Sequence, residues 1–220
     1  MLGTSGSYEE LVLEGRSVMD RINGGPWDVA EVADDGVERL DLGSVLITPT
    51  AGIDVQAQAD QDTGAVTQLT LNRPDGMVQV QPYAAPRSGG LWEDIRGQIA
   101  SSINANGGLV EVVEGPFGPE LRAQVSPSDG SAGLQPARFC GMEGPRWFLR
   151  AVFLGAAARP GEAADALEAM VRSLVIVRGD EAMPVGAPIP IRLPQQKAVA
   201  PADPELPSPF ERGPEITETR

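Results

Sequence analysis

The pattern of apolar and polar positions predicts three antiparallel strands in the first half of the chain. Over residues 53–60 apolar and polar side chains alternate, which is the period of a half-buried strand. A hairpin turn at residues 62–64 leads into a second strand over residues 65–72. A further Asp-Gly turn at residues 75–76 precedes residues 77–83, where the alternation returns. Short connections of this kind favour antiparallel pairing.

Apolar positions recur with a period of 3.6 residues in three segments, each of which predicts an amphipathic helix. These segments are residues 7–22, 91–104 and 161–174. Ser88 lies just before the second segment and could cap it. Strands are predicted around the last two helices, over residues 109–114, 120–126, 133–142, 146–154 and 174–177.

The order of these elements predicts an α+β fold: a mainly antiparallel sheet with two amphipathic helices packed on it. We expect an N-terminal amphipathic arm over residues 1–25, a single domain over residues 26–180 and a tail over residues 181–220. The tail is rich in proline and has no apolar period, so we expect it to be extended or disordered. The exception is residues 189–193, which are apolar enough to lie along the core as an extended strap.

Composition restricts the chemistry that the chain can perform. Among its 220 residues there is no histidine and a single cysteine, Cys140. Catalytic triads that need histidine, disulfides within the chain and metal sites built from imidazole or thiolate ligands are therefore excluded. We expect a non-catalytic protein without a metal or cofactor.

Charge and hydropathy argue against several classes of partner and against a place in the membrane. The net charge of −14 argues against nucleic acid and anionic membranes, because phosphate contacts need a basic patch. The apolar runs are far shorter than the roughly 18–20 residues of a membrane span. No basic segment followed by an apolar one marks the N-terminus as a secretory signal. We therefore expect a cytoplasmic protein.

Several unusual short segments resemble an actinobacterial family, the domain-of-unknown-function family numbered 3710. They are residues 25–29, 39–43, 85–89, 114–118, 144–150 and 178–183. The resemblance covers roughly residues 25–194 and implies an actinobacterial cytoplasmic protein, but it implies no activity. The element order also resembles the Mog1/PsbP-like fold, whose members are largely binding proteins.

A row of arginines is the most distinctive candidate site. If the strands at 133–142 and 146–154 pair as a hairpin, three arginines point to one side, and a fourth joins them from the preceding strand. The four residues are Arg138, Arg146, Arg150 and Arg122. Guanidinium groups on one face can bind a carboxylate or a phosphate. The opposite, helix-covered side is then expected to carry Phe139, Trp147, Leu149 and Phe153.

Three features, the arginine face among them, have more than one interpretation. The arginine face is either a binding site or a solvated, salt-bridged face, with Glu111, Glu114 or Glu120 as partners. Cys140 is either a reactive thiol with a lowered pKa or an ordinary buried cysteine. The turn at residues 86–90 either holds an anion on free N–H groups or caps the helix that follows.

Two functions are consistent with these features. The first is a binding or adaptor module that acts through protein–protein contacts with an unknown partner. The apolar stripe of the arm would contribute to such contacts through Tyr8, Leu11, Val18 and Ile22. The alternative is a domain that binds or senses a small anionic ligand on its arginine-lined sheet face.

Overall fold

The computed structural model describes residues 24–32, 35–60, 64–126 and 133–193. The predicted arm helix and its four partner-binding residues, Tyr8, Leu11, Val18 and Ile22, lie outside the described residues. Most of the predicted turn at residues 62–64 lies outside them too. Of the tail predicted to begin at residue 181, the structure describes the part that ends at Leu193.

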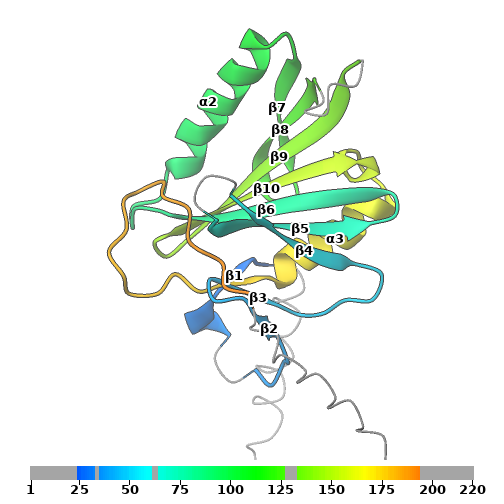
Figure 1. The fold of residues 1–220 in the computed structure, drawn as a ribbon. Helices are drawn as coiled ribbons and strands as arrows, with labels where there is room; N and C mark the ends of the chain where they lie inside the picture. Colours follow the sequence, from blue (N-terminus) through cyan, green and yellow to red (C-terminus); the bar gives the residue numbers. More distant parts are fainter. Residues whose placement is uncertain (1–23, 33–34, 61–63, 127–132, 194–220) are drawn as a thin grey trace, which may run out of the picture.

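A seven-stranded antiparallel sheet dominates the fold (Figure 1). Its strands lie in the order β4-β5-β6-β10-β9-β8-β7, so the two edges are β4 and β7. Their bounds are β4 Asp54–Ala59, β5 Val66–Arg73, β6 Gly76–Ala84, β7 Leu109–Gly115, β8 Gly118–Val125, β9 Gln135–Gly144 and β10 Trp147–Gly155. Each of these strands overlaps a predicted one, because alternation of apolar and polar side chains reports a half-buried strand directly.

A second, four-stranded sheet is built from short strands that are far apart in sequence. Its order is β1-β11-β3-β2, with bounds β1 Trp27–Asp28, β2 Leu40–Asp41, β3 Val45–Ile47 and β11 Val175–Ile176. The predicted buried strand at residues 174–177 is therefore real. It pairs with β1 and β3 rather than with the large sheet.

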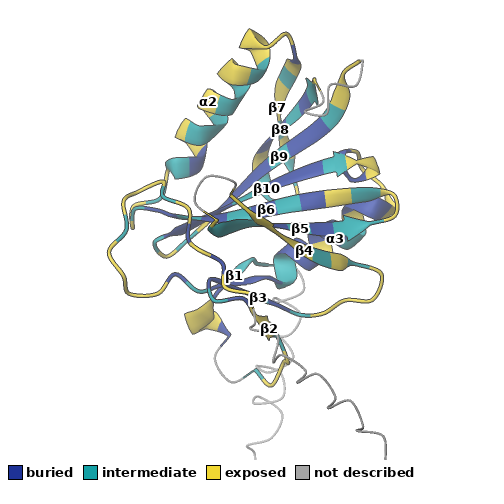
Figure 2. Ribbon diagram, in the orientation of Figure 1, coloured by how far each residue is buried: buried dark blue, intermediate teal, exposed yellow. Residues whose placement is uncertain are grey.

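Two α-helices cover opposite faces of the large sheet (Figure 2). α3, Glu162–Ser173, packs on the face that carries Leu149 and Phe153, and this α3 face holds the main core. α2, Leu91–Ala105, packs on the other face, the α2 face, through Trp92 against Phe148. The short 3-10 helices η1, Val29–Glu31, and η2, Ala156–Ala158, complete the described elements. The α+β prediction is confirmed.

No helix in the described ranges combines the length and the apolar character needed to cross a membrane.

The expected strap lies along the core. Ile189 and Ile191 are 4% and 5% exposed and belong to the main core cluster. The Ile189 N–H donates to the carbonyl of Pro82 at 2.9 Å, and the Ile191 N–H donates to that of Val66 at 2.7 Å. The packed part of the chain therefore continues beyond residue 180, and burial of the two isoleucines together with these backbone hydrogen bonds opposes the entropy lost in ordering the strap.

Candidate functional site

The predicted row of arginines is wrong, because the hairpin between β9 and β10 has a different register. Gly144 pairs with Trp147 across a two-residue turn, so Arg138 lies opposite Phe153 and Arg150 lies opposite Gly141. Side chains directly opposite each other share a face, so Arg138 is on the α3 face and Arg150 is on the α2 face. A turn longer or shorter by one residue would have reversed this relation.

The same register corrects the expected apolar face. Trp147, Leu149 and Phe153 lie together on the α3 face, as predicted. Phe139 lies opposite Val152, on the α2 face, where it packs with the Trp92 cluster. Both faces are covered by a helix, so the sheet has no single helix-covered side.

Two of the predicted arginines have separate local roles. Arg146 occupies the β9–β10 turn with φ of 65°, and its carbonyl accepts from the Arg178 Nε at 3.2 Å. Arg150 donates from Nη2 to Gln81 Oε1 at 2.8 Å, and its guanidinium lies 5.6 Å from the centre of the Tyr83 ring. These contacts stabilise the fold and do not bring the two side chains together.

Arg138 belongs to a buried ionic cluster between the sheet and α3. Arg138 is only 2% exposed. Its Nη1 lies 2.6 Å from Glu168 Oε1 and 3.8 Å from Glu120 Oε2. Its guanidinium also stacks on the Phe153 ring, 4.1 Å from the ring centre. Arg122 Nε lies 3.4 Å from Glu120 Oε1. The salt-bridged interpretation therefore holds for Arg138, with Glu120 as one of the predicted partners.

Sequence reasoning missed Glu168, although one signal was present. Glu168 follows Ala164 by four residues and precedes Val171 by three, so it lies on the apolar stripe of α3. A charged residue on such a stripe is buried when the helix packs, and burial of a charge requires a partner. Arg138 on the facing sheet is that partner.

Cys140 is an ordinary buried cysteine, and the reactive-thiol interpretation is wrong. Its residue is 0% exposed, and its Sγ donates to Glu120 Oε2 at 3.4 Å. Burial raises the pKa of the thiol well above its usual range, the Glu120 carboxylate raises it further, and Arg138 only partly opposes them. A thiolate nucleophile is therefore suppressed. Among the described residues no group of three His, Cys, Asp or Glu side chains could hold a metal ion.

The turn at residues 86–90 is not an anion site, because a carboxylate already occupies the helix N-terminus. Glu143, at the end of β9, accepts from the Gly90 N–H through Oε2 at 2.8 Å and from the Trp92 N–H through Oε1 at 2.7 Å. The expected cap, Ser88, makes no side-chain bond to the helix, whose N-cap residue is Gly90. The cap comes from a strand about fifty residues away, which local spacing does not reveal.

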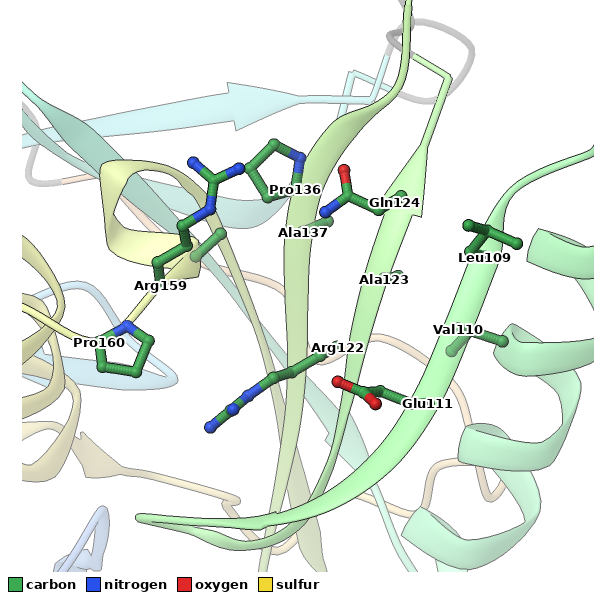
Figure 3. Close-up of a pocket in the computed structure, with 11 residues that line it drawn as sticks. Leu109, Val110, Glu111, Arg122, Ala123, Gln124, Pro136, Ala137, Arg159 and Pro160 are labelled. Atoms are coloured by element: carbon green, nitrogen blue, oxygen red, sulfur yellow. The ribbon is translucent and has the colours of Figure 1, made fainter.

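A pocket of about 420 Å³ lies on the α3 face beside β7 and β8 (Figure 3). Glu111 and Arg122 point into it from neighbouring strands, and Arg159 reaches it from the loop after η2. Of the four predicted arginines only Arg122 contributes to this pocket, which we call the Arg122–Arg159 pocket. Apolar parts of its lining come from Leu109, Pro136, Ala137, Ala158 and Pro160, and a further polar side chain comes from Gln124.

The outer edge of β7 is the most exposed apolar part of the sheet. Leu109 is 65% exposed and Val112 is 60% exposed, the two highest fractions among large apolar side chains in the described ranges. β8 pairs with one side of β7, and no other strand of the described chain pairs with its outer side. Glu111 and Glu114 on this strand are also exposed. The sequence predicted the strand but not its position at an edge.

Comparisons with known proteins agree with the resemblance noted in the sequence. A family model described as protein of unknown function (DUF3710) matches residues 25–200. No curated protein matches the chain. A crystal structure from Bacteroides thetaiotaomicron VPI-5482 is similar at 16% identity and a TM-score of 0.34, over 65% of this chain and 52% of that one. The chain thus spans about half the length of that protein, and a likeness this weak carries no argument. The Mog1/PsbP-like resemblance stays a prediction.

Proposed function

The chain belongs to the DUF3710 family, and from that premise we propose that it is a non-catalytic binding module that acts through protein–protein contacts. The family description names no activity, so the proposal rests on the surface of this molecule. The observation that carries it is the open edge at β7, with its exposed Leu109 and Val112.

An open sheet edge is a binding surface unless the protein protects it. Alternate backbone N–H and C=O groups of an edge strand point away from the sheet and can pair with a further strand. Proteins protect such edges with proline, with charged side chains, above all lysine, with bulges or with short length. β7 has seven residues, contains neither proline nor lysine, and pairs with β8 in unbroken register. Its charged side chains are two glutamates, Glu111 and Glu114, which restrict the partner rather than close the edge. These features support strand addition by a partner protein.

The opposite edge of the same sheet is less suited to a partner. In β4 polar side chains alternate with valine and alanine, and none of its large apolar side chains is exposed. Its pairing with β5 is broken by a bulge between Gln58 and Ala59. Because bulges twist an edge away from further pairing, β4 is the natural control for β7.

We further propose that the module works in the cytoplasm of an actinobacterium. This proposal rests on the resemblance found in the sequence, because a single cysteine forms no disulfide within the chain in any compartment. The arm residues Tyr8, Leu11, Val18 and Ile22 remain proposed contributors to partner contacts, on the basis of their apolar stripe in the sequence alone.

A small-anion function remains the second candidate, at a different place from the one predicted. The Arg122–Arg159 pocket supports it, because Arg159 forms no ion pair with any described residue and apolar side chains form part of the walls. Glu111 in the same pocket and the Glu120 contact of Arg122 weaken its attraction for an anion. We therefore rank it below the edge.

Site-specific photo-crosslinking tests the proposal in the native cell. A benzophenone amino acid replaces Val112 in the full chain, and a matched variant carries it at Ala57 on the β4 edge. We expect a discrete cross-linked protein at Val112 that is absent at Ala57. After that protein is identified and purified, its binding should slow hydrogen exchange of the β7 amides and leave the β4 amides unchanged.

Two results would overturn this function. Equal cross-linking at both positions would show that the β7 edge has no special role. Absence of any cross-link, together with a rise in melting temperature caused by phosphate or citrate, would favour the anion candidate. That rise should then be lost in the double variant Arg122→Ala, Arg159→Ala.

A further inference from the structure

We propose that the β7 edge selects an extended partner segment in which basic and apolar residues alternate in a fixed pattern. This inference rests on the proposed function and adds the chemistry of the partner. The pattern follows from the side chains that β7 presents on its two faces, and from the charge around them.

An added strand places its side chains beside those of β7 on both faces of the sheet. Leu109 and Glu111 lie on the α3 face, whereas Val112 and Glu114 lie on the α2 face. Each face of the edge therefore offers one exposed apolar position and one acidic position two residues away. An antiparallel partner would meet Glu114 first, then Val112, Glu111 and Leu109.

The partner segment is thus six residues long. Read from its N-terminus, it has basic residues at its first and fourth positions, apolar residues at its third and sixth, and any residue at the other two. The basic side chains would lie beside Glu114 and Glu111, and the apolar ones beside Val112 and Leu109. Opposite charges directly across a strand pair stabilise it, and apolar pairs bury surface that is exposed in the free protein.

The two glutamates are available for such pairing. Neither forms an ion pair with any described residue, and both are exposed. Arg122 is the cross-strand neighbour of Glu111, but its guanidinium contacts the buried Glu120 instead. The net charge of −14 adds an attraction for a basic segment that operates beyond contact distance.

The same charges argue against a second copy of this chain as the occupant. Pairing β7 with itself would bring two acidic edges together, and two chains each of net charge −14 repel. Like charges close together across a strand pair are destabilising. Glu111 and Glu114 therefore act against self-association while they favour a basic partner.

Binding of designed peptides to the full-length protein tests the inference. The first probe is an eight-residue capped peptide with lysine at its second and fifth positions, valine at its fourth and seventh, and threonine elsewhere. The second carries glutamate in place of both lysines. The third is the lysine peptide with N-methylated valines. The N–H groups of its fourth and seventh residues point to opposite sides of an extended strand, so N-methylation removes one hydrogen bond to β7 and keeps the charge. Affinity is measured by fluorescence anisotropy at low salt.

We expect the lysine peptide to bind and the other two to bind at least about tenfold more weakly. In the variant Glu111→Lys, Glu114→Lys the preference should reverse, so that the glutamate peptide binds better. The matched control Asp54→Lys, on the exposed β4 edge, should leave the lysine peptide's affinity unchanged. Circular dichroism confirms that each variant folds.

Failure of the inference differs from failure of the proposed function. Equal affinity of the lysine and glutamate peptides, or binding that N-methylation does not change, would overturn the inference. No peptide binding in a protein that still cross-links at Val112 would also overturn it, while the adaptor function stands. Loss of the cross-link itself would overturn the function.

Discussion

At the scale of single residues, Arg138 shows how a candidate binding residue becomes a structural one. Its guanidinium is held between the Phe153 ring and the Glu168 carboxylate, and its Nε and Nη2 have no hydrogen-bond partner among the described residues. Such a charge is tolerated only because an opposite charge lies beside it. The ionic pair therefore joins α3 to the sheet and leaves Arg138 unavailable to a ligand.

Removal of one member of this pair should destabilise the fold strongly. Glu168→Ala leaves the buried guanidinium with only Glu120, at 3.8 Å, and should lower the free energy of unfolding by about 3–5 kcal/mol. Glu162→Ala on the same helix removes a side chain that is 94% exposed, and should change the free energy of unfolding by less than about 1 kcal/mol. Urea denaturation measures both.

The double variant Arg138→Met, Glu168→Leu separates two quantities: the free-energy cost of burying the two charges, and the contribution of their pairing to the stability of the fold. Replacing both charges with apolar side chains of similar size should recover most of the lost stability, because no charge remains buried. If Glu168→Ala alone were as stable as the wild type, the pair would not hold α3 on the sheet.

At the scale of elements, the boundaries of the main elements followed the local pattern, but the group that caps α2 did not. The alternating and helical periods place the strands of the large sheet and the two α-helices within a few residues of their observed bounds, whereas they did not mark β1, β2 and β3. The cap of α2, however, is Glu143 of β9 rather than Ser88. Glu143 thus joins the helix to the sheet as well as satisfying its first N–H groups.

The two candidate caps give a matched test at this scale. Glu143→Ala removes two charge-assisted hydrogen bonds and should lower the free energy of unfolding by about 1–2 kcal/mol. Ser88→Ala should change it by less than about 0.5 kcal/mol, because that side chain makes no bond to the helix. Equal effects in urea denaturation would contradict the assignment of the cap to Glu143.

At the scale of the whole molecule, the strap connects the two sheets. Arg192 donates from its backbone N–H to the carbonyl of Leu42 at 2.7 Å, next to the small sheet, whereas Ile189 and Ile191 bond to β6 and β5. Segments near residues 42, 66, 82 and 190 therefore lie side by side (Figure 1). The C-terminal part of the described chain is a component of the core.

Substitutions along the strap measure its contribution. Ile189→Ala or Ile191→Ala should each lower the free energy of unfolding by about 2–4 kcal/mol, because each leaves a cavity in the core. Leu193→Ala, at a side chain that is 54% exposed, should change it by less than about 0.5 kcal/mol. Isoleucine variants as stable as Leu193→Ala would show that the strap does not hold the two sheets together.

The sequence predicted some of the residues of the candidate sites, the Arg122–Arg159 pocket and the β7 edge, but not how they are arranged. Arg122 was identified, yet Arg159 was not, since it lies in a loop without a pattern. The β7 edge was missed because a strand's position in the sheet order depends on all the other strands. Whether an apolar residue of a strand is buried therefore follows from topology rather than from its own sequence.

The sequence by itself determined the α+β class, the positions of the main strands and helices, and the family, because side-chain spacing within one element is local information. Only the tertiary structure decided which residues meet. The two-residue turn at Pro145 and Arg146 separated Arg138 from Arg150, and packing of α3 brought Glu168 to Arg138. Register and partnership depend on contacts between residues far apart in the chain, and a shift of one residue reverses every face.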